Sequence, residues 1–381
     1  MNKKALFFLL GSFFVNLTYA QMLATGGSPL APDEWLLGQG QIWHYHTNTA
    51  SKPKQLNFRE PKADEKSVVE KAQQILASSS AKSIALVDGI DVVWVGYKPP
   101  ANSSSHFLSF SVGKTVTAMA VGKAICDGKF SLNSVTEDLV PELKGTDLGK
   151  ATVKNLLMMS SGTWRGNKDS TIVTAEQWRQ LLSGELNTLE LLKTSQVNSY
   201  QSGIFGSDKP GEQFQYRSTD PLTLGVIINR KTGMDFVKWV EKEVLIPAGI
   251  KTYGIIGQDK SNYGIADGNV RLTMDDWIRF AIWVKENQVA KGCFGDYVRA
   301  ASTTQISNNT SFGKAFGGYG YLIWTDNNRL KDSYWANGWG GQRIGWNHKN
   351  DRILIAFSNV ENYVDELYWL YKDWATIGPS K

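Results

Sequence analysis

Segments rich in β-forming residues lie near both ends of this chain, and helical patterns fill the sequence between them. Near the N-terminus, residues 83–87 and 92–95 are apolar runs on either side of Asp88-Gly89, a pattern typical of a β-hairpin. Three further runs that predict strands follow near the C-terminus, at 319–324, 341–346 and 352–358. Because the backbone groups of strands need partners, the two ends must join in one sheet. We predict an α/β (α+β) fold in which an antiparallel sheet, built from N- and C-terminal segments and flanked by helices, carries a mostly helical inserted lobe.

Helical patterns occupy most of the remaining chain. Apolar spacing and capping residues predict helices over 66–78, 111–126, 153–159, 220–230, 235–244, 273–284 and 363–374. Thr273, with Asp276 three residues later, is typical of a helix start. We place the inserted helical lobe at about residues 120–300.

Ser111 and Lys114 stand three residues apart at the start of the helical stretch 111–126. One helical turn places such side chains on neighbouring surface positions, so the lysine can take the proton of the serine. Three other Ser-x-x-Lys matches lie in a polar stretch, a helix end and a loop, and they begin at Ser51, Ser79 and Ser311. We therefore predict Ser111 as a nucleophile. The alternative is a serine that begins a buried helix beside an incidental lysine.

A serine–lysine pair needs a second proton relay and donors for a developing oxyanion. Tyr216 and Ser218 can point the same way from an extended segment before a helix, which makes Tyr216 a candidate relay. The Gly-rich segment 336–342 lets a backbone approach a substrate closely, and the N–H groups of Gln342 and Ser111 could together hold an oxyanion. A packing tyrosine and a plain hairpin corner are the alternatives.

The order of these three elements resembles the serine β-lactamase and penicillin-binding protein superfamily, in particular its class C-like branch. That branch includes D-Ala-D-Ala carboxypeptidases, esterases and 6-aminohexanoate-dimer hydrolases. The stretches 127–132, 152–162 and 214–218 add to the similarity, which spans about residues 75–365. The resemblance implies a β-lactamase/transpeptidase-like domain over 61–365, followed by a C-terminal helix end and tail over 366–381. It implies no cofactor.

By this resemblance, Ser111 is the acylated nucleophile, Lys114 is its base partner and Tyr216 relays protons to the leaving group. Ser218 stands where the family often carries asparagine. Lys231-Thr232-Gly233 matches the third motif of the family letter for letter, but it ends the helix that follows Tyr216, and we interpret it as a helix cap.

The position-matched third motif is Trp339-Gly340-Gly341, with Gln342 directly after it. Relatives that bind β-lactams or peptide C-termini hold a carboxylate there with a cation and a hydroxyl, and an indole with glycine offers neither. We therefore expect weak β-lactamase and carboxypeptidase activity. Our hypothesis is that Trp339, with Trp335 or Trp346, walls a cleft for a neutral or extended ester or amide.

The function predicted from these residues is that of an exported serine hydrolase that acts through an acyl-enzyme on an ester or amide. A D-Ala-D-Ala carboxypeptidase or β-lactamase is one alternative, and a non-catalytic protein of the same fold that binds cell-envelope components is another. A rival enzyme class is the α/β-hydrolases, because residues 109–113 are one residue from a Gly-x-Ser-x-Gly elbow. His348 would then be the base, since it is the only histidine after Ser111.

The first twenty residues are typical of an export signal, with Lys3, Lys4, an apolar run over 5–15 and a small-residue end at Ala20. We predict a periplasmic or secreted protein without a stable membrane span after signal removal, and a 21–60 extension of unassigned role. Removal of the signal lowers the net charge from +5 to +3, with 39 basic and 36 acidic residues left. No long basic block supports nucleic-acid binding.

Two cysteines and four histidines complete the candidates for covalent or metal chemistry. Cys126 and Cys293 could pair in an oxidising compartment, or could remain buried thiols. His44 and His46 would lie on one face of a strand, as metal ligands can, but no acidic or cysteine cluster completes a site. We expect no metal, and the sequence predicts no oligomeric state.

Overall fold

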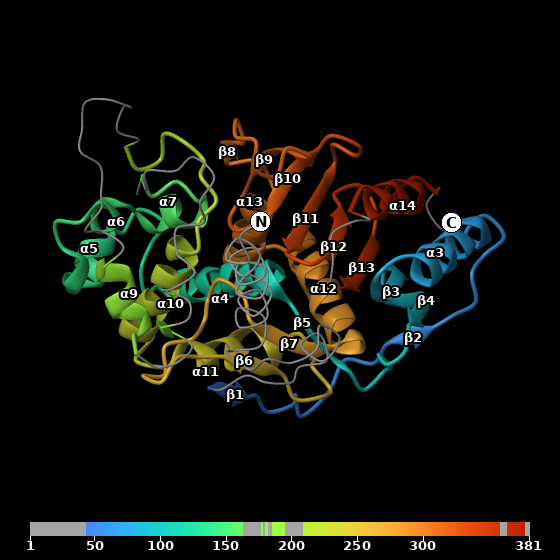
Figure 1. Ribbon diagram of the computed structural model, residues 1–381, viewed down its shortest axis with the longest axis horizontal. Coiled ribbons are helices and arrows are strands. Elements are labelled where there is room, and N and C mark those ends of the chain that lie inside the picture. Colours follow the sequence, from blue (N-terminus) through green and yellow to red (C-terminus); the bar gives the residue numbers. More distant parts are fainter. Residues whose placement is uncertain are drawn as a thin grey trace, which may run out of the picture.

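A nine-stranded sheet formed by both ends of the chain is the centre of the computed structural model (Figure 1). The structure describes residues 43–162, 177, 180, 181, 185–194, 209–358 and 364–377. The strands of this sheet follow in their spatial order: β2 (Asn57–Phe58), β4 (Asp91–Tyr97), β3 (Ala81–Asp88), β13 (Arg352–Ser358), β12 (Gln342–Asn347), β11 (Ser333–Gly338), β10 (Trp324–Asn327), β9 (Phe316–Tyr319) and β8 (Ile306–Ser307).

The N-terminal and C-terminal strands meet between β3 and β13, which pair antiparallel with Leu86 opposite Leu354. β2 pairs with β4 in parallel, and the other strand pairs of this sheet in the described residues are antiparallel. The predicted fold class and the hairpin around Asp88-Gly89 are therefore confirmed.

The C-terminal strands differ in detail from the sequence prediction. The single strand predicted over 319–324 is wrong, because β9 ends at Tyr319 and β10 begins at Trp324, its cross-strand partner. A turn joins them, with the Gly320 amide donating to the Ile323 carbonyl (2.8 Å) and Leu322 at φ +54°. The turn residues are themselves apolar, so alternation of side chains could not reveal the turn. β11 was missed because its last three residues, 336–338, belong to the Gly-rich segment.

Helices surround this sheet and form the lobe beside it (Figure 1). Their bounds are α3 (Lys66–Ser78), α4 (Gly113–Cys126), α5 (Thr136–Leu139), α6 (Asp147–Lys150), α7 (Val153–Leu157), α9 (Thr188–Thr194), α10 (Thr219–Thr232), α11 (Phe236–Val240), α12 (Met274–Val289), α13 (Cys293–Ala301) and α14 (Val364–Thr376). A π-helical turn, Glu241–Leu245, continues α11. The predicted helix starts near Lys66 and Thr273 are confirmed, and the Thr273 side chain accepts from the Asp276 amide.

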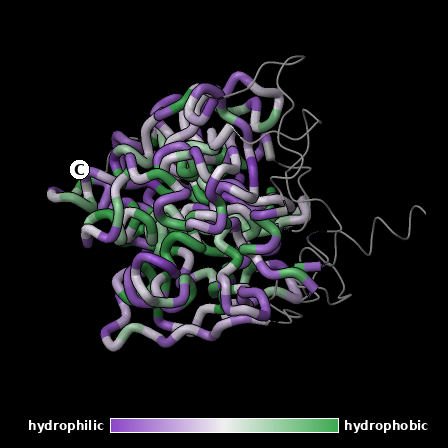
Figure 2. The backbone as a smooth tube through the Cα atoms, turned by 90° about the vertical axis from the view of Figure 1, so that its left-hand side faces the viewer, coloured by the Kyte–Doolittle hydropathy of each residue, from purple (hydrophilic) through white to green (hydrophobic). Residues whose placement is uncertain are grey.

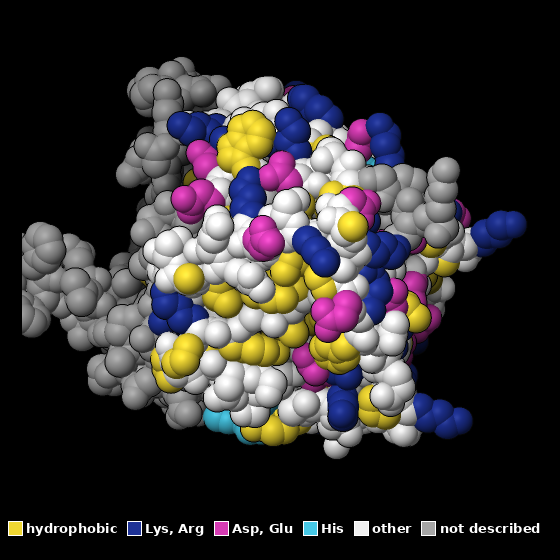
Figure 3. All heavy atoms as spheres, turned by 90° about the vertical axis from the view of Figure 1, so that its right-hand side faces the viewer, with side chains coloured by type: hydrophobic (Ala, Val, Ile, Leu, Met, Phe, Trp, Pro, Cys, Tyr) yellow, Lys and Arg dark blue, Asp and Glu magenta, His cyan; other side chains and the backbone are white. Residues whose placement is uncertain are grey.

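The sheet is covered on both faces around β3 and β13. Every residue of β13 is buried, and successive side chains of a strand point to opposite faces. α3 and α14 pack on each other and on these strands, and α12 also contacts both strands. In Figure 2 the hydrophobic segments concentrate in the interior of the fold. On the face shown in Figure 3, which carries α3 and α14, acidic and basic side chains are interspersed, and Lys71 pairs with Asp373 between the two helices.

A second, four-stranded sheet lies beside the lobe, in the order β1 (His44–His46), β6 (Ile255–Gly257), β7 (Val270–Thr273) and β5 (His106–Leu108). Through β1 and β2, residues of the predicted 21–60 extension pair with both sheets. The predicted signal, and residues 21–42, lie outside the described residues. Within the described ranges, no helix combines the length and apolar character needed to cross a membrane.

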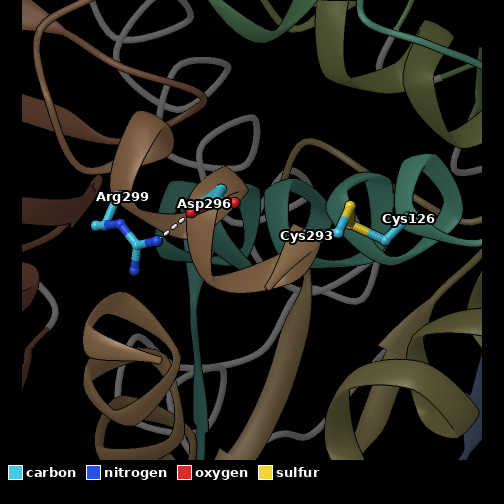
Figure 4. Close-up of a disulfide and its surroundings, with 4 residues drawn as sticks. All are labelled: Cys126, Cys293, Asp296 and Arg299. Atoms are coloured by element: carbon cyan, nitrogen blue, oxygen red, sulfur yellow. Dashed lines mark hydrogen bonds and ion pairs between the residues drawn. A yellow bond between two sulfur atoms is a disulfide. The ribbon is translucent and has the colours of Figure 1, made fainter. Parts of the chain in front are cut away.

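Helix α4 runs through the interior and contacts α10, α11, α13 and β11. Eleven of its residues are buried, so it is covered on nearly all sides rather than along one stripe. At its end, Cys126 forms a disulfide with Cys293, the first residue of α13, across 167 residues of sequence (Figure 4). This bond decides between the two states that the sequence left open. Asp296 and Arg299 of α13 form an ion pair nearby in Figure 4.

Candidate active site

Ser111 and Lys114 lie together at the start of α4. Ser111 belongs to a short 3-10 turn, Phe110–Val112, and α4 begins one residue later. The Lys114 Nζ lies 2.9 Å from the Ser111 Oγ, and only 2% of Lys114 is exposed. In the match that begins at Ser51, by contrast, the Lys54 amine pairs with Glu286. A buried lysine within hydrogen-bond reach of a serine is the geometry that nucleophile activation requires.

The turn that carries Ser111 is bonded to the first residue of β7. The Ser109 amide donates to the Val270 carbonyl (2.8 Å), and the Val270 amide donates to the Ser109 Oγ (3.0 Å). Phe110 adopts φ +43°, a left-handed conformation that costs energy for a bulky residue. A Cβ on Gly268 would lie 2.6 Å from the Phe110 carbonyl oxygen, so the two backbones touch.

Asp267 completes the surroundings of Lys114. The Lys114 Nζ donates to the Asp267 carbonyl at 2.6 Å and lies 3.8 Å from the Asp267 Oδ2. Sequence reasoning missed this residue, because Asp267-Gly268 has the signature of an ordinary turn. Its distance of 153 residues from Lys114 left no local signal for the contact.

Tyr216 borders the same lysine. The Lys114 Nζ lies 5.1 Å from the centre of the Tyr216 ring. That ring stacks on Trp324 (5.3 Å between centroids) and on Phe312 (5.0 Å), so aromatic side chains from distant segments hold the tyrosine in place. Ser218 is buried directly before α10.

A buried carboxyl group lies in the first turn of α10. Burial raises the pKa of Asp220 to about 6, against the opposing effects of Arg217 and of the hydrogen bonds from Ser161. The Ser161 Oγ donates to Asp220 at 2.7 Å. The Tyr216-x-Ser218 segment is thereby anchored to the residues that follow α7.

The hairpin turn 339–341 lies beside the nucleophile turn. Gly340 and Gly341 have φ +78° and +91°, values that favour glycine, and Gln342 stands opposite Gly338 at the start of β12. A Cβ on Gly338 would lie 2.5 Å from the Ser109 carbonyl oxygen. The Trp339 ring, 47% exposed, meets the Phe110 ring edge-on at 5.2 Å.

Trp335 and Trp346 do not line a substrate cleft, as our hypothesis from the sequence required of one of them. Trp335 and Trp346 are fully buried, and their indole N–H groups donate to the Ser333 hydroxyl and the Ala281 carbonyl. Because both side chains are fully buried within the protein, they belong to the core and do not line a cleft. The Gln342 side chain is also buried and bonds to Ser358 on β13. Gln342 as an oxyanion donor, through its backbone, stays a prediction.

The remaining candidates have structural partners away from Ser111. Lys231-Thr232-Gly233 ends α10, and Gly233 has the left-handed conformation of a helix cap (φ +70°). The His348 ring nitrogens bond to Gln288 and Ser302, which leaves the α/β-hydrolase reading without its base at the nucleophile.

The histidines of β1 lie in an aromatic group. His44 lies next to His46, which stacks on Tyr253. Burial, with the charges of His44 and His106, lowers the pKa of His46. Within the described part of the chain, no three or more His, Cys, Asp or Glu side chains are arranged to hold a metal ion.

Comparison with known proteins identifies the family of this chain. A family model described as Beta-lactamase matches residues 69–375. The 6-aminohexanoate-dimer hydrolase of Paenarthrobacter ureafaciens is 23% identical over 304 residues, which cover 75% of this chain and 74% of that protein. Protein flp of Staphylococcus aureus is 26% identical over 159 residues, or 40% of this chain and 28% of that protein.

Solved structures show the same fold. A Bacillus anthracis protein, provisionally described as a 6-aminohexanoate-dimer hydrolase, has a TM-score of 0.70 at 16% identity over 88% of this chain and 90% of that one. A D-stereospecific amidohydrolase from Streptomyces sp. has a TM-score of 0.58 at 15% identity, covering 82% of this chain and 99% of that one. Because the family model matches most of its length, this chain belongs to the Beta-lactamase family, within the serine β-lactamase and penicillin-binding protein superfamily.

Proposed function

We propose that the protein is a serine hydrolase that cleaves an ester or amide bond through an acyl-enzyme on Ser111. The observation that carries this proposal is the 2.9 Å contact between the Ser111 Oγ and the buried Lys114 Nζ. The Lys114 Nζ also donates to the Asp267 carbonyl, and in the proposal the same nitrogen takes the proton of Ser111. The similarity to a 6-aminohexanoate-dimer hydrolase supports an amide or ester substrate.

In the proposed first step, the Ser111 Oγ bonds to the substrate carbonyl carbon and its proton passes to Lys114. The negative charge that develops on the carbonyl oxygen is held by the N–H groups of Ser111 and Gln342. The bond to the leaving group then breaks, and the leaving atom receives a proton through Tyr216. Water then attacks the carbonyl carbon of the acyl-enzyme in the same way, which releases the acid and restores the Ser111 hydroxyl.

We further propose that the protein is exported to the periplasm or secreted. The export signal predicted over residues 1–20 supports this location. The Cys126–Cys293 disulfide supports it too, because disulfides persist in oxidising compartments.

The substrate class follows from the third motif. Trp339-Gly340-Gly341 offers no cation or hydroxyl for a substrate carboxylate. We therefore propose a neutral substrate, with β-lactams and D-Ala-D-Ala peptides hydrolysed slowly. The non-catalytic alternative requires an inert Ser111, and the ester hydrolysis assay described next distinguishes it from the proposed function.

The test is the initial rate of p-nitrophenyl acetate and butyrate hydrolysis by the mature protein and its Ser111→Ala variant. We expect the variant to lose at least about 99.9% of kcat/KM and to show no acyl adduct by mass spectrometry, because the nucleophile is absent. The control is Ser51→Ala, which alters an exposed Ser-x-x-Lys match and should hydrolyse at the wild-type rate. Equal rates for wild type and Ser111→Ala would overturn the proposal, and faster turnover of a cephalosporin than of the best ester would overturn the substrate class.

A further inference from the structure

An exposed phenyl ring lies directly on the proposed proton relay. Phe312 is 51% exposed, although a large apolar side chain gains free energy from burial. Its ring stacks on Tyr216 with 5.0 Å between centroids and an interplanar angle of 29°, and it lies 6.1 Å from the Trp324 ring. The Phe312 ring therefore covers one face of Tyr216 and presents an apolar surface to solvent beside it.

The turn that presents Phe312 is well organised. The Asn308 side-chain amide donates to the Phe312 carbonyl (2.9 Å) and the Phe316 carbonyl (3.1 Å), and its oxygen accepts from the Thr310 hydroxyl (2.8 Å). Gly313, at φ +65°, lies so close to the Trp324 ring that an added Cβ would meet it at 2.4 Å. The chain between β8 and β9 therefore holds the ring over Tyr216 through specific bonds.

We propose that Phe312 is a specificity-determining residue that binds an apolar aryl or alkyl group on the leaving-group side of the substrate. The inference rests on the proposed function, in which Tyr216 delivers a proton to the leaving atom. A group attached to that atom would extend from Tyr216 past the exposed Phe312 ring. Contact between this group and the ring removes apolar surface of both from water. The substrates of this site are therefore esters or amides of apolar alcohols or amines.

The experiment compares two acetate esters that share their acyl group, phenyl acetate, with an apolar leaving group, and 2-hydroxyethyl acetate, with a polar one, by titration of released acid. Each rate of Phe312→Ala is divided by the wild-type rate for the same ester, so that the intrinsic reactivity of the ester cancels. We expect kcat/KM to fall about tenfold for phenyl acetate, mainly through a higher KM, and to change less than about twofold for 2-hydroxyethyl acetate. Phe312→Tyr, which keeps the ring, should restore the phenyl acetate value.

The matched control is Phe58→Ala, which removes an equally exposed ring (57%) from β2, at the opposite edge of the nine-stranded sheet. For this variant, the ratio of the variant rate to the wild-type rate should stay near one for both esters. An equal fall for both esters in Phe312→Ala would mean that the ring only supports Tyr216, and it would overturn the inference while the proposed function stands. Unchanged hydrolysis of both esters by Ser111→Ala would instead overturn the proposed function.

Discussion

Lys114 makes two contacts that its proposed role as the base requires. Its Nζ reaches the Ser111 hydroxyl, and the Asp267 carbonyl accepts from the same nitrogen. Because only 2% of the residue is exposed, bulk water does not compete for these bonds. The Gly268 backbone packs against the Phe110 carbonyl, so the 267–270 segment contacts both the turn that carries Ser111 and the Lys114 amine.

Replacement of Lys114 by alanine tests its role as the base. We expect kcat/KM for p-nitrophenyl acetate to fall by a factor of about 10³, in the range typical of a lost general base, with no burst of p-nitrophenol in stopped-flow measurements. Lys54→Ala, which removes a lysine paired with Glu286 at the surface, serves as the control. A normal burst in a folded Lys114→Ala protein would exclude Lys114 as the base.

At the level of elements, a charged cluster joins α3 to the sheet. The Arg59 guanidinium donates to both Glu65 oxygens (2.6 and 2.8 Å) and to Asp88 at 3.0 Å, and Arg352 of β13 lies 3.2 Å from Glu65. Burial by itself raises the pKa of Glu65. Hydrogen bonds from Arg59 and the Lys62 amide, with the charge of Arg352, outweigh burial and lower that pKa to about 2.

This lowered pKa predicts acid sensitivity. A carboxyl group whose pKa is about 2 in the folded protein and 4.5 in the unfolded chain contributes about 3 kcal/mol of stability above pH 4.5, which is lost as the pH falls toward 2. Glu65→Gln should therefore lower the free energy of unfolding by about this amount at pH 7, and its difference from wild type should shrink toward pH 2. Urea titrations at several pH values measure this, with exposed Glu60→Gln as the control. A difference independent of pH would contradict the electrostatic origin.

For the whole molecule, the disulfide connects α4, which begins two residues after Ser111, to α13. It joins the end of α4 to the start of α13 across 167 residues, and α13 also contacts α4 and α12. A cross-link between segments this distant restricts the unfolded chain. The contacts that position Ser111 and Lys114 are made by other residues, at 267–270.

Removal of the cross-link should cost stability rather than activity. We expect Cys126→Ser with Cys293→Ser to lower the free energy of unfolding by about 2–4 kcal/mol, with ester hydrolysis at 25 °C within about twofold of wild type. Thermal unfolding with and without dithiothreitol measures this, because reductant should lower the Tm of the wild type and leave the double variant unchanged. A wild type with fully reduced thiols and an unaltered Tm would contradict the expectation.

Local patterns were sufficient for much of this molecule. The hairpin around Asp88-Gly89, the cap at Thr273, the left-handed Gly233 and the sheet joined from both chain ends all follow from the sequence, because each depends on residues a few positions apart or on the need of strands for partners. The turn between β9 and β10 did not, since its residues are as apolar as those of the strands.

Contacts over long sequence distances were decided by the tertiary structure alone. The Asp267 carbonyl at Lys114 and the Phe312 ring on Tyr216 join segments that carry no mutual signal, and the sequence named Cys126 and Cys293 as a possible pair without deciding between disulfide and thiols. Sequence patterns report hydrophobicity and local conformation over a few residues. The path of the backbone between distant segments depends on how the whole core packs, and that packing placed Asp267 and Phe312 beside Lys114 and Tyr216.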